Sequence, residues 1–317
     1  MKQSISEFDV FYLSFDEPQK EEHWAHLQNL APWAKRVDGV KGFDNAHKAC
    51  ALASETDRFI TVDGDNLVYP EFFELELDIP ASLDDAVLSW AGKNTINGLC
   101  YGNGGLKLWT KDFVLGMKTH ENALTEEEKL DFCWDSKYVQ LNNTYSTTNP
   151  NGSPFQAFRA GFREGVKMTL DRGGRVSEGT IAKQLHEINF KRLLVWAAIG
   201  ADVENGMWAI YGTRLGIYLT NIEKNFEISK ISDYAWFADY FSNEIAPRFI
   251  GDKSSRCRRT GLVWDESLLT AACTALLGPL QKSLGLRIAD VGAEQSIFFK
   301  NVYTPPPRNG NPLMTEA

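Results

Sequence analysis

The stretch that most constrains the fold is a short apolar strand that ends in two carboxylates. Within RFITVDGDNLVYP, residues 58–70, the apolar and β-branched run 59–62 is typical of a buried strand, and Asp63-Gly64-Asp65 ends it. Mg²⁺ and Mn²⁺ prefer carboxylate oxygens, and Gly64 lets the backbone turn so that Asp63 and Asp65 face one ion and the diphosphate that it carries. The stretch therefore predicts a metal site at a strand end.

An isolated Asp-Gly pair has a simpler interpretation, which is a tight turn between two paired strands. That interpretation needs a partner strand directly after Asp65. Residues 69–73, YPEFF, instead have the pattern of a helical turn opened by Pro70, and two strand-helix units lie upstream. This context favours the metal site over the hairpin turn.

The two upstream units predict an open α/β sheet. Their strands and helices are expected, in chain order, at 9–14, 19–30, 35–37 and 43–54. Such sheets bind ligands beyond the carboxyl ends of their strands, and a polar turn, FDEP, follows the first strand. We therefore expect the nucleotide base near Ser14, Phe15 and Asp16.

The second of these helices begins close to several cations. Lys41, His47 and Lys48 lie at or near its start, immediately before the strand that carries the two carboxylates. A cation there would reach the diphosphate of a bound nucleotide, with Lys41 and Lys48 preferred over His47. The alternative is that these residues are solvated helix charges.

Length and composition fit a large α/β enzyme. A chain of 317 residues buries a large core, and nine Trp in 12% aromatic content suit an enzyme that presents rings to a sugar or a base. The net charge of −9 argues against nucleic-acid binding over the whole surface but leaves room for a local basic track. Scattered Cys residues and the lack of a long apolar segment predict a soluble, cytoplasmic protein without membrane contact.

The order of these elements resembles the nucleotide-binding half of GT-A glycosyltransferases over about residues 1–140. A helix bearing Asn45 and Lys48 is followed by a hydrophobic strand and the DxD motif Asp63-Gly64-Asp65. The strings DVFYLSFDEP, LAPWAKRVDGVKGFDNAHKA and SPFQAFRAGFREGVKM are similar to those of phage-encoded glycosyltransferases of DNA hypermodification, which add a sugar to 5-hydroxymethylpyrimidine bases. The resemblance implies a Rossmann-like mixed sheet flanked by helices, a UDP-sugar donor, Mn²⁺ or Mg²⁺, and action in the host cytoplasm.

The acceptor side is expected downstream of the carboxylates. Trp90 lies in a predicted strand at 86–91, and Asn103, Gly104 and Gly105 lie in a Gly-rich loop that permits close approach of a ligand. In the enzymes that this chain resembles, the corresponding loop and strand hold donor sugar and acceptor. The alternative is a hairpin turn without a ligand.

The resemblance also implies a catalytic base after the metal motif. Asp135, beside the substrate-binding candidate Trp134, is the first choice for the base of an inverting enzyme, and Glu127 and Asp131 are competitors. In an enzyme that retains anomeric configuration, Asp135 would instead orient the acceptor hydroxyl.

Three further groups of residues are candidates for ligand contact. GT-A enzymes often use one more metal ligand, and His186 or His120 would serve, although a single helical His is more often structural. In the helix opened by Ser153 and Pro154, a stripe of Arg159, Arg163 and Lys167 would contact the donor diphosphate or a DNA phosphate, or would form a solvated face. A basic segment, RFIGDKSSRCRR at 248–259, is a candidate track for a polyanion, with surface ion pairing as the alternative.

We predict three parts along the chain. Residues 1–175 form the GT-A catalytic core, residues 176–302 form a helical region that completes the acceptor site, and residues 303–317 form a flexible Pro-rich tail. Helices of the second part are expected at 182–199, 207–219, 232–246 and 267–284.

These observations predict a metal-dependent glycosyltransferase that transfers a sugar from a nucleotide-sugar to the hydroxymethyl group of 5-hydroxymethylpyrimidine in DNA. A glycosyltransferase acting on a glycan, lipid or small molecule would share every donor-side feature. A nucleotidyltransferase also uses paired carboxylates at a strand end, and a DNA-binding protein without catalytic activity is the remaining alternative.

Overall fold

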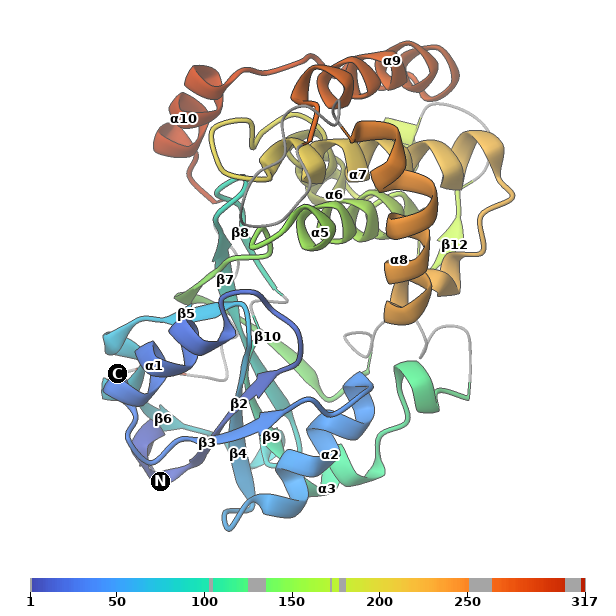
Figure 1. Cartoon of the computed structure of the whole chain (residues 1–317). Coiled ribbons are helices and arrows are strands. Elements are labelled where there is room, and N and C mark those ends of the chain that lie inside the picture. The colour runs from blue at the N-terminus through green and yellow to red at the C-terminus, as the bar shows by residue number, and fades with distance from the viewer. Residues whose placement is uncertain are drawn as a thin grey trace. The chain divides into compact units, whose positions relative to one another are not determined.

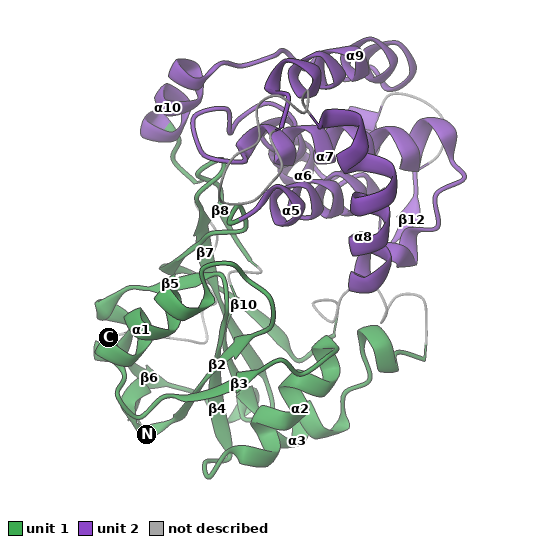
Figure 2. Ribbon diagram, in the orientation of Figure 1, with its two compact units in different colours: residues 1–152, 303–317 green, residues 153–302 purple. Residues whose placement is uncertain are grey.

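The computed structural model describes residues 2–102, 105–124, 135–171, 173–176, 181–250, 264–305 and 315–316. The chain divides into two compact units, coloured separately in Figure 2. Unit 1 comprises residues 1–152 and 303–317, and unit 2 comprises residues 153–302. The division falls between Gly152 and Ser153, earlier than the predicted limit at residue 175, so the helix opened by Ser153 belongs to unit 2.

Unit 1 is built on a mixed eight-stranded sheet (Figure 1). Its strand order is β3-β2-β4-β9-β7-β10-β5, with β8 paired to β7. The parallel pairs are β2–β3, β2–β4 and β7–β10, and the other pairs are antiparallel. The strand bounds are β2 (Asp9–Ser14), β3 (Lys35–Asp38), β4 (Arg58–Asp63), β5 (Asn66–Val68), β7 (Val87–Asn94), β8 (Cys100–Tyr101), β9 (Leu106–Thr110) and β10 (Tyr138–Thr148). A mixed sheet in an α/β unit is therefore confirmed.

Two helices cover opposite faces of the sheet because successive strand residues point to opposite sides. Tyr12 packs in the cluster that includes Leu27 of α1 (Lys20–Leu30). Its neighbour Phe11 packs in the cluster that includes Cys50 of α2 (Phe43–Ala53). Since β3 and β4 flank β2 on its two sides, the strand order switches direction there, and open α/β sheets bind ligands at such switch points.

The segment after the two carboxylates differs from the prediction. A strand, β5, follows Asp65 at once, and the helical turn opened by Pro70 comes only after it, as the short 3₁₀ helix Pro70–Glu74. However, β5 pairs with β10, whereas β4 pairs with β2 and β9. The Asp-Gly-Asp turn therefore connects two strands of one sheet that are not hydrogen-bonded to each other, so it is not a hairpin turn.

Smaller elements complete unit 1. Thr110 caps α3 (Lys111–Gly116) by accepting the Phe113 N–H, because the last residue of β9 has an extended backbone and a free hydroxyl oxygen. A second sheet joins β1 (Lys2–Ser4), β6 (Glu76–Asp78) and β13 (Thr315–Glu316). Residues 315–316 of the tail, predicted to be flexible, thus pair with β6.

Unit 2 is largely helical, as predicted. Its elements are α5 (Pro154–Lys167), β11 (Leu170–Asp171), β12 (Gly174–Arg175), α6 (Glu187–Trp196), α7 (Gly206–Tyr218), α8 (Tyr234–Tyr240), α9 (Glu266–Leu284) and α10 (Ala293–Val302). Ser153 accepts the Gln156 N–H at the start of α5, and Pro154 takes its first position, as the capping pattern predicted. Across the described ranges, none of the helices combines the length and apolar character needed to span a bilayer.

Glycines set the packing of α5 against α7. A Cβ on Gly161 would lie 1.9 Å from the Ala209 carbonyl oxygen, and one on Gly212 would lie 2.3 Å from the Phe158 carbonyl oxygen. The missing side chains let the two backbones approach until each glycine contacts the opposite helix. Phe158 and Phe162 of α5 then fill the surrounding core, and both are fully buried.

Candidate functional site

The candidate site begins where two parallel strands end together. In the β2–β4 pair Leu13 lies opposite Asp63, so the turn after β2 and the turn after β4 share one edge of the sheet, beside the switch point. Asp63 is half-buried. Burial raises the pKa of its carboxyl, and the positive charge of the buried Lys107 only partly opposes that increase.

A second carboxylate with a raised pKa lies in the turn after β2. The Glu17 carboxylate sits over the other turn, because a Cβ on Gly64 would be 2.7 Å from Glu17 Oε2. Burial raises the pKa of Glu17, the Phe15 N–H that it accepts at 2.7 Å lowers it, and the negative charges of Asp16 and Asp63 raise it further. A cation at this edge would relieve the cost of burying both carboxylates.

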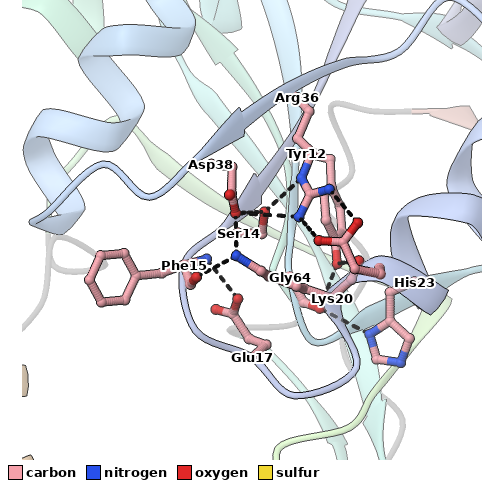
Figure 3. A network of polar contacts seen from close by, with 10 residues as sticks. Tyr12, Ser14, Phe15, Glu17, Lys20, His23, Arg36, Asp38 and Gly64 are labelled. Carbon is pink, nitrogen blue, oxygen red and sulfur yellow. Dashed lines mark hydrogen bonds and ion pairs between the residues drawn. The ribbon is translucent and has the colours of Figure 1, made fainter.

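The Asp-Gly-Asp turn is held from the α1 side (Figure 3). Tyr12 Oη donates to the Gly64 carbonyl oxygen at 2.8 Å, and His23 Nδ1 lies 2.9 Å from the same oxygen. The Asn149 N–H donates to the Asp65 carbonyl oxygen at 2.7 Å. Burial, followed by the charges of Glu17 and Asp65, raises the pKa of Tyr12, which keeps its hydroxyl protonated as a donor. The turn is therefore held by contacts to two of its backbone carbonyl oxygens.

The donor set fits a cation that arrives with a diphosphate. Within the described ranges no three His, Cys, Asp or Glu side chains converge in a way that would hold a metal ion. Mg²⁺ commonly binds one or two carboxylates and completes its shell with waters and substrate phosphates. Asp63 and Glu17 supply two carboxylates at one edge of the sheet, and Asp65 belongs to the same turn as Asp63.

Beside this edge, a polar network joins the ends of β2 and β3 (Figure 3). Ser14 Oγ donates to Asp38 Oδ1 at 2.7 Å, Lys20 Nζ donates to the same oxygen at 2.8 Å, and Arg36 Nε donates to Ser14 Oγ at 3.1 Å. The hydrogen bonds from Lys20 and Ser14 hold the pKa of Asp38 below its usual range. The network surrounds the predicted base-binding residue Ser14 with fixed donors and acceptors.

The other two predicted base-binding residues lie in the turn itself. Phe15 uses both backbone groups, donating to Glu17 and accepting from Lys20 Nζ at 2.7 Å, and Figure 3 shows its ring pointing away from Asp38. Asp16 is exposed. Sequence patterns did not single out Lys20, which begins α1, or Arg36 and Asp38, which lie within and at the end of β3.

The three cations predicted near the start of α2 differ in burial and in their partners. His47 is buried, and burial lowers its pKa to about 3, so it carries no positive charge at neutral pH and the predicted cationic role is wrong. Lys48 Nζ donates to Asp44 Oδ2 at 2.8 Å and to the Met117 carbonyl oxygen at 2.9 Å. Lys41 is exposed at the start of the helix and stays a candidate.

The N-terminus of α2 already holds a carboxylate. Glu121 Oε1 accepts the Asn45 N–H at 2.9 Å, and a Cβ on Gly42 would lie 2.1 Å from the same oxygen. An anion at a helix N-terminus is stabilised by free N–H groups and by the helix dipole, and Glu121 supplies that anion here. The predicted position of the diphosphate at this helix start therefore does not fit the structure.

On the acceptor side, one prediction is wrong and several lie outside the described residues. Trp90 is fully buried in β7 and packs edge-on against Phe72 with ring centroids 5.0 Å apart, so it presents no surface to an acceptor. Gly105 adopts φ +69° and lies against Asp63, whose N–H donates to the Gly105 carbonyl oxygen at 3.0 Å. The residues outside the described ranges are Asn103, Gly104, Glu127, Asp131 and Trp134.

The predicted catalytic base, Asp135, lies in a turn of unit 1. Asp135 is exposed, and its Oδ1 accepts the Lys137 N–H at 2.8 Å in the turn that leads into β10. Asp135 stays a prediction.

The predicted contact residues of unit 2 have structural partners. His186 is exposed and caps α6, with Nδ1 accepting the Ile188 N–H at 3.3 Å, so the helix that was predicted to contain it begins only after it. The Arg159 guanidinium lies over the rings of Tyr234 and Phe237, at 4.8 and 5.8 Å from their centroids. The stripe therefore packs on α8 at this position.

Two further cationic predictions of unit 2 remain untested. Arg163 is half-buried, and its Nε is buried without a hydrogen-bond partner among the described residues. In the basic segment, Arg248 lies 3.9 Å from Glu244, and residues 251–259 lie outside the described ranges.

Comparison with known proteins gives little similarity. No protein-family model matches the chain, and no curated protein does. Among solved structures, the crystal structure of HddC from Yersinia pseudotuberculosis is similar at 15% sequence identity and a TM-score of 0.32, over 48% of this chain and 97% of HddC. A TM-score this low carries no argument about fold or function.

Proposed function

We propose that the protein is a metal-dependent glycosyltransferase of the GT-A type, which moves a sugar from a nucleotide-sugar, with UDP-sugar as the first choice, to the hydroxymethyl group of 5-hydroxymethylpyrimidine in phage DNA. The observation that carries the proposal is the pair of carboxylates with raised pKa, Asp63 and Glu17, at the switch point between β2 and β4. The resemblance of the DxD region and of three longer strings supports the choice of reaction and acceptor.

In the proposed reaction, Asp63 and Asp65 bind the diphosphate through Mn²⁺ or Mg²⁺, and the network of Ser14, Lys20 and Asp38 orients the nucleoside. The bound metal supplies positive charge that stabilises the departing nucleoside diphosphate. The acceptor oxygen bonds to the anomeric carbon while the bond from that carbon to the diphosphate oxygen breaks and leaves its electron pair on the diphosphate. In an inverting enzyme, Asp135 takes the hydroxyl proton.

The DNA acceptor requires access to the base. The hydroxymethyl group of a base lies in the major groove, so either groove entry or extrusion of the nucleotide brings it to the donor. The basic segment at 248–259 is the proposed track for the DNA phosphates.

The test is incubation of the protein with labelled nucleotide-sugars, Mn²⁺, and hydroxymethylated or unmodified DNA. We expect label on the hydroxymethylated DNA alone, with release of a nucleoside diphosphate and loss of transfer in Asp63→Asn. Label on a glycan, lipid or small molecule would favour the second acceptor class, and release of pyrophosphate would favour a nucleotidyltransferase. Absence of transfer from every donor, with DNA retention unchanged in Asp63→Asn and Asp65→Asn, would overturn the proposal in favour of a DNA-binding protein.

A further inference from the structure

A buried amide lies next to the Asp-Gly-Asp turn without a partner. Asn66 begins β5 directly after Asp65, and its side chain is 1% exposed. Among the described residues, neither its Oδ1 nor its Nδ2 has a hydrogen-bond partner. Leaving a buried amide unpaired costs about 1–3 kcal/mol, so such a group needs a physical reason.

The carboxamide of Asn66 and the carboxylate of Asp63 converge on one point. A Cβ built on Gly105 would lie 2.0 Å from Asn66 Nδ2 and 2.7 Å from Asp63 Oδ2. Both side chains therefore flank the same glycine, where any larger residue would displace them. Gly105 also has φ +69°, a backbone conformation that residues with a side chain rarely adopt. Both the lack of space and the backbone conformation therefore favour glycine at this position.

The chemistry of the two side chains favours a small cation. Asn66 is 1% exposed, so its carboxamide offers no surface to a sugar ring. Oxygen ligands from Asp and Asn side chains are the ones that hard divalent cations take. Because no hydrogen bond fixes the carboxamide, a half-turn about its last bond brings Oδ1 to the position that Nδ2 holds, at the side of Asp63.

We propose that Asn66 is a metal ligand of this site: its Oδ1 coordinates, together with the Asp63 carboxylate, the divalent cation of the donor diphosphate. The proposal deepens the glycosyltransferase function and rests on it for the identity of the diphosphate. It also makes the binding motif one residue longer than DxD, as Asp63-Gly64-Asp65-Asn66.

The test is direct Mn²⁺ binding to the full-length protein, measured from the electron paramagnetic resonance signal of free Mn²⁺ with and without UDP. We expect Asn66→Ala to weaken Mn²⁺ binding by about 10-fold or more, as loss of a metal-site group commonly does. Asn97→Ala is the matched control, because Asn97 is also fully buried in unit 1 with an unpaired Nδ2, and it should leave Mn²⁺ affinity unchanged. Equal Mn²⁺ affinity in Asn66→Ala and wild type would overturn the proposal.

A second variant keeps the test decisive if Asn66→Ala fails to fold. Asn66→Asp has the same shape and offers a charged oxygen, so we expect it to bind Mn²⁺ about 10-fold more tightly and to gain more in melting temperature on Mn²⁺ addition than wild type does. Unchanged or weaker binding in this variant would contradict the ligand role. Mn²⁺ binding that depends on Asn66, in a protein that transfers no sugar, would refute the proposed function alone, whereas transfer with Mn²⁺ binding indifferent to Asn66 would refute this inference alone.

Discussion

Arg214 in unit 2 is held in the protein in the opposite way to Asp63 and Asn66, which neighbour each other in unit 1. In unit 2, Arg214 is 1% exposed, and its guanidinium donates to the Ala197 and Cys273 carbonyl oxygens at 2.8 Å and to Asp290 Oδ1 at 2.6 Å. In unit 1, Asp63 has a raised pKa, and the neighbouring Asn66 has no partner among the described residues. A buried charge whose donors are matched stabilises one arrangement of the chain, whereas unmatched polar groups that converge mark a place for a ligand.

The largest expected effect is on the matched charge. Arg214→Met removes the tie between α7 and the segments that carry Ala197, Cys273 and Asp290, and leaves carbonyl groups buried without donors. We expect the free energy of unfolding to fall by about 3–5 kcal/mol, measured by urea denaturation. Lys191→Met is the control, because it breaks an ion pair with Glu187 that is exposed on both sides, and it should change stability by less than about 0.5 kcal/mol. Equal losses in the two variants would remove the distinction between a matched buried charge and a surface pair.

The Asp63 carboxylate should show the reverse pattern. If the proposed function holds, Asp63→Asn removes a charge that binds the metal and should reduce sugar transfer by about 10²–10³-fold, since electrostatic groups at a reaction centre commonly contribute that much. The same change removes a carboxylate whose ionised form is penalised by burial, so we expect an equal or higher melting temperature without metal. A large drop in the melting temperature of Asp63→Asn would show that Asp63 is structural and not functional.

His47 adds a third case to the comparison of buried polar groups, because it is a buried base that burial keeps neutral. Its folded-state pKa of about 3 lies below the ordinary value of 6.5, so between these two values the unfolded chain binds a proton that the folded chain does not. Its contribution to stability is therefore intact above about pH 6.5 and is lost as the pH falls toward 3, at about 1.4 kcal/mol per pH unit. His47→Gln, which does not titrate, should flatten the fall in unfolding free energy between about pH 6 and pH 4 by that amount. Parallel curves for the two proteins would contradict a buried neutral His47.

Much of the architecture was predictable because it follows from local patterns. The strand that ends at Asp63 and the helix beginning at Phe43 lie within one residue of their predicted bounds, since apolar runs and helical spacing are set by neighbours in the sequence. The start of the helix at Ser153 was equally local. The unit boundary was not, because it depends on α5 packing against α7, which are far apart in the chain.

The candidate site was predictable only in part. Asp63 lies at the edge of the sheet because a strand ends there, which the sequence shows. The burial of Trp90 and His47 depends on which face of the sheet each side chain packs against. The local sequence pattern does not show which face that is. Glu17 and Asn66 were missed for another reason: the role proposed for each depends on contact with a glycine that lies elsewhere in the sequence, Gly64 for Glu17 and Gly105 for Asn66. A polar residue directly after DxD was the signal that was available.

The smallest expected effects concern two helix glycines of unit 2. They test whether the space around a glycine, without any charge, decides if replacement by Ala lowers or raises stability. Gly161→Ala places a methyl group 1.9 Å from the Ala209 carbonyl oxygen, so α5 and α7 must separate, and we expect a loss of about 1–3 kcal/mol in unfolding free energy. Gly278→Ala in α9 meets nothing within 4 Å, and the lower conformational freedom of the unfolded chain should raise stability by about 0.4–1 kcal/mol. Opposite signs for one chemical change would establish that the α5–α7 contact requires glycine, and a gain in both variants would contradict the close approach of these helices.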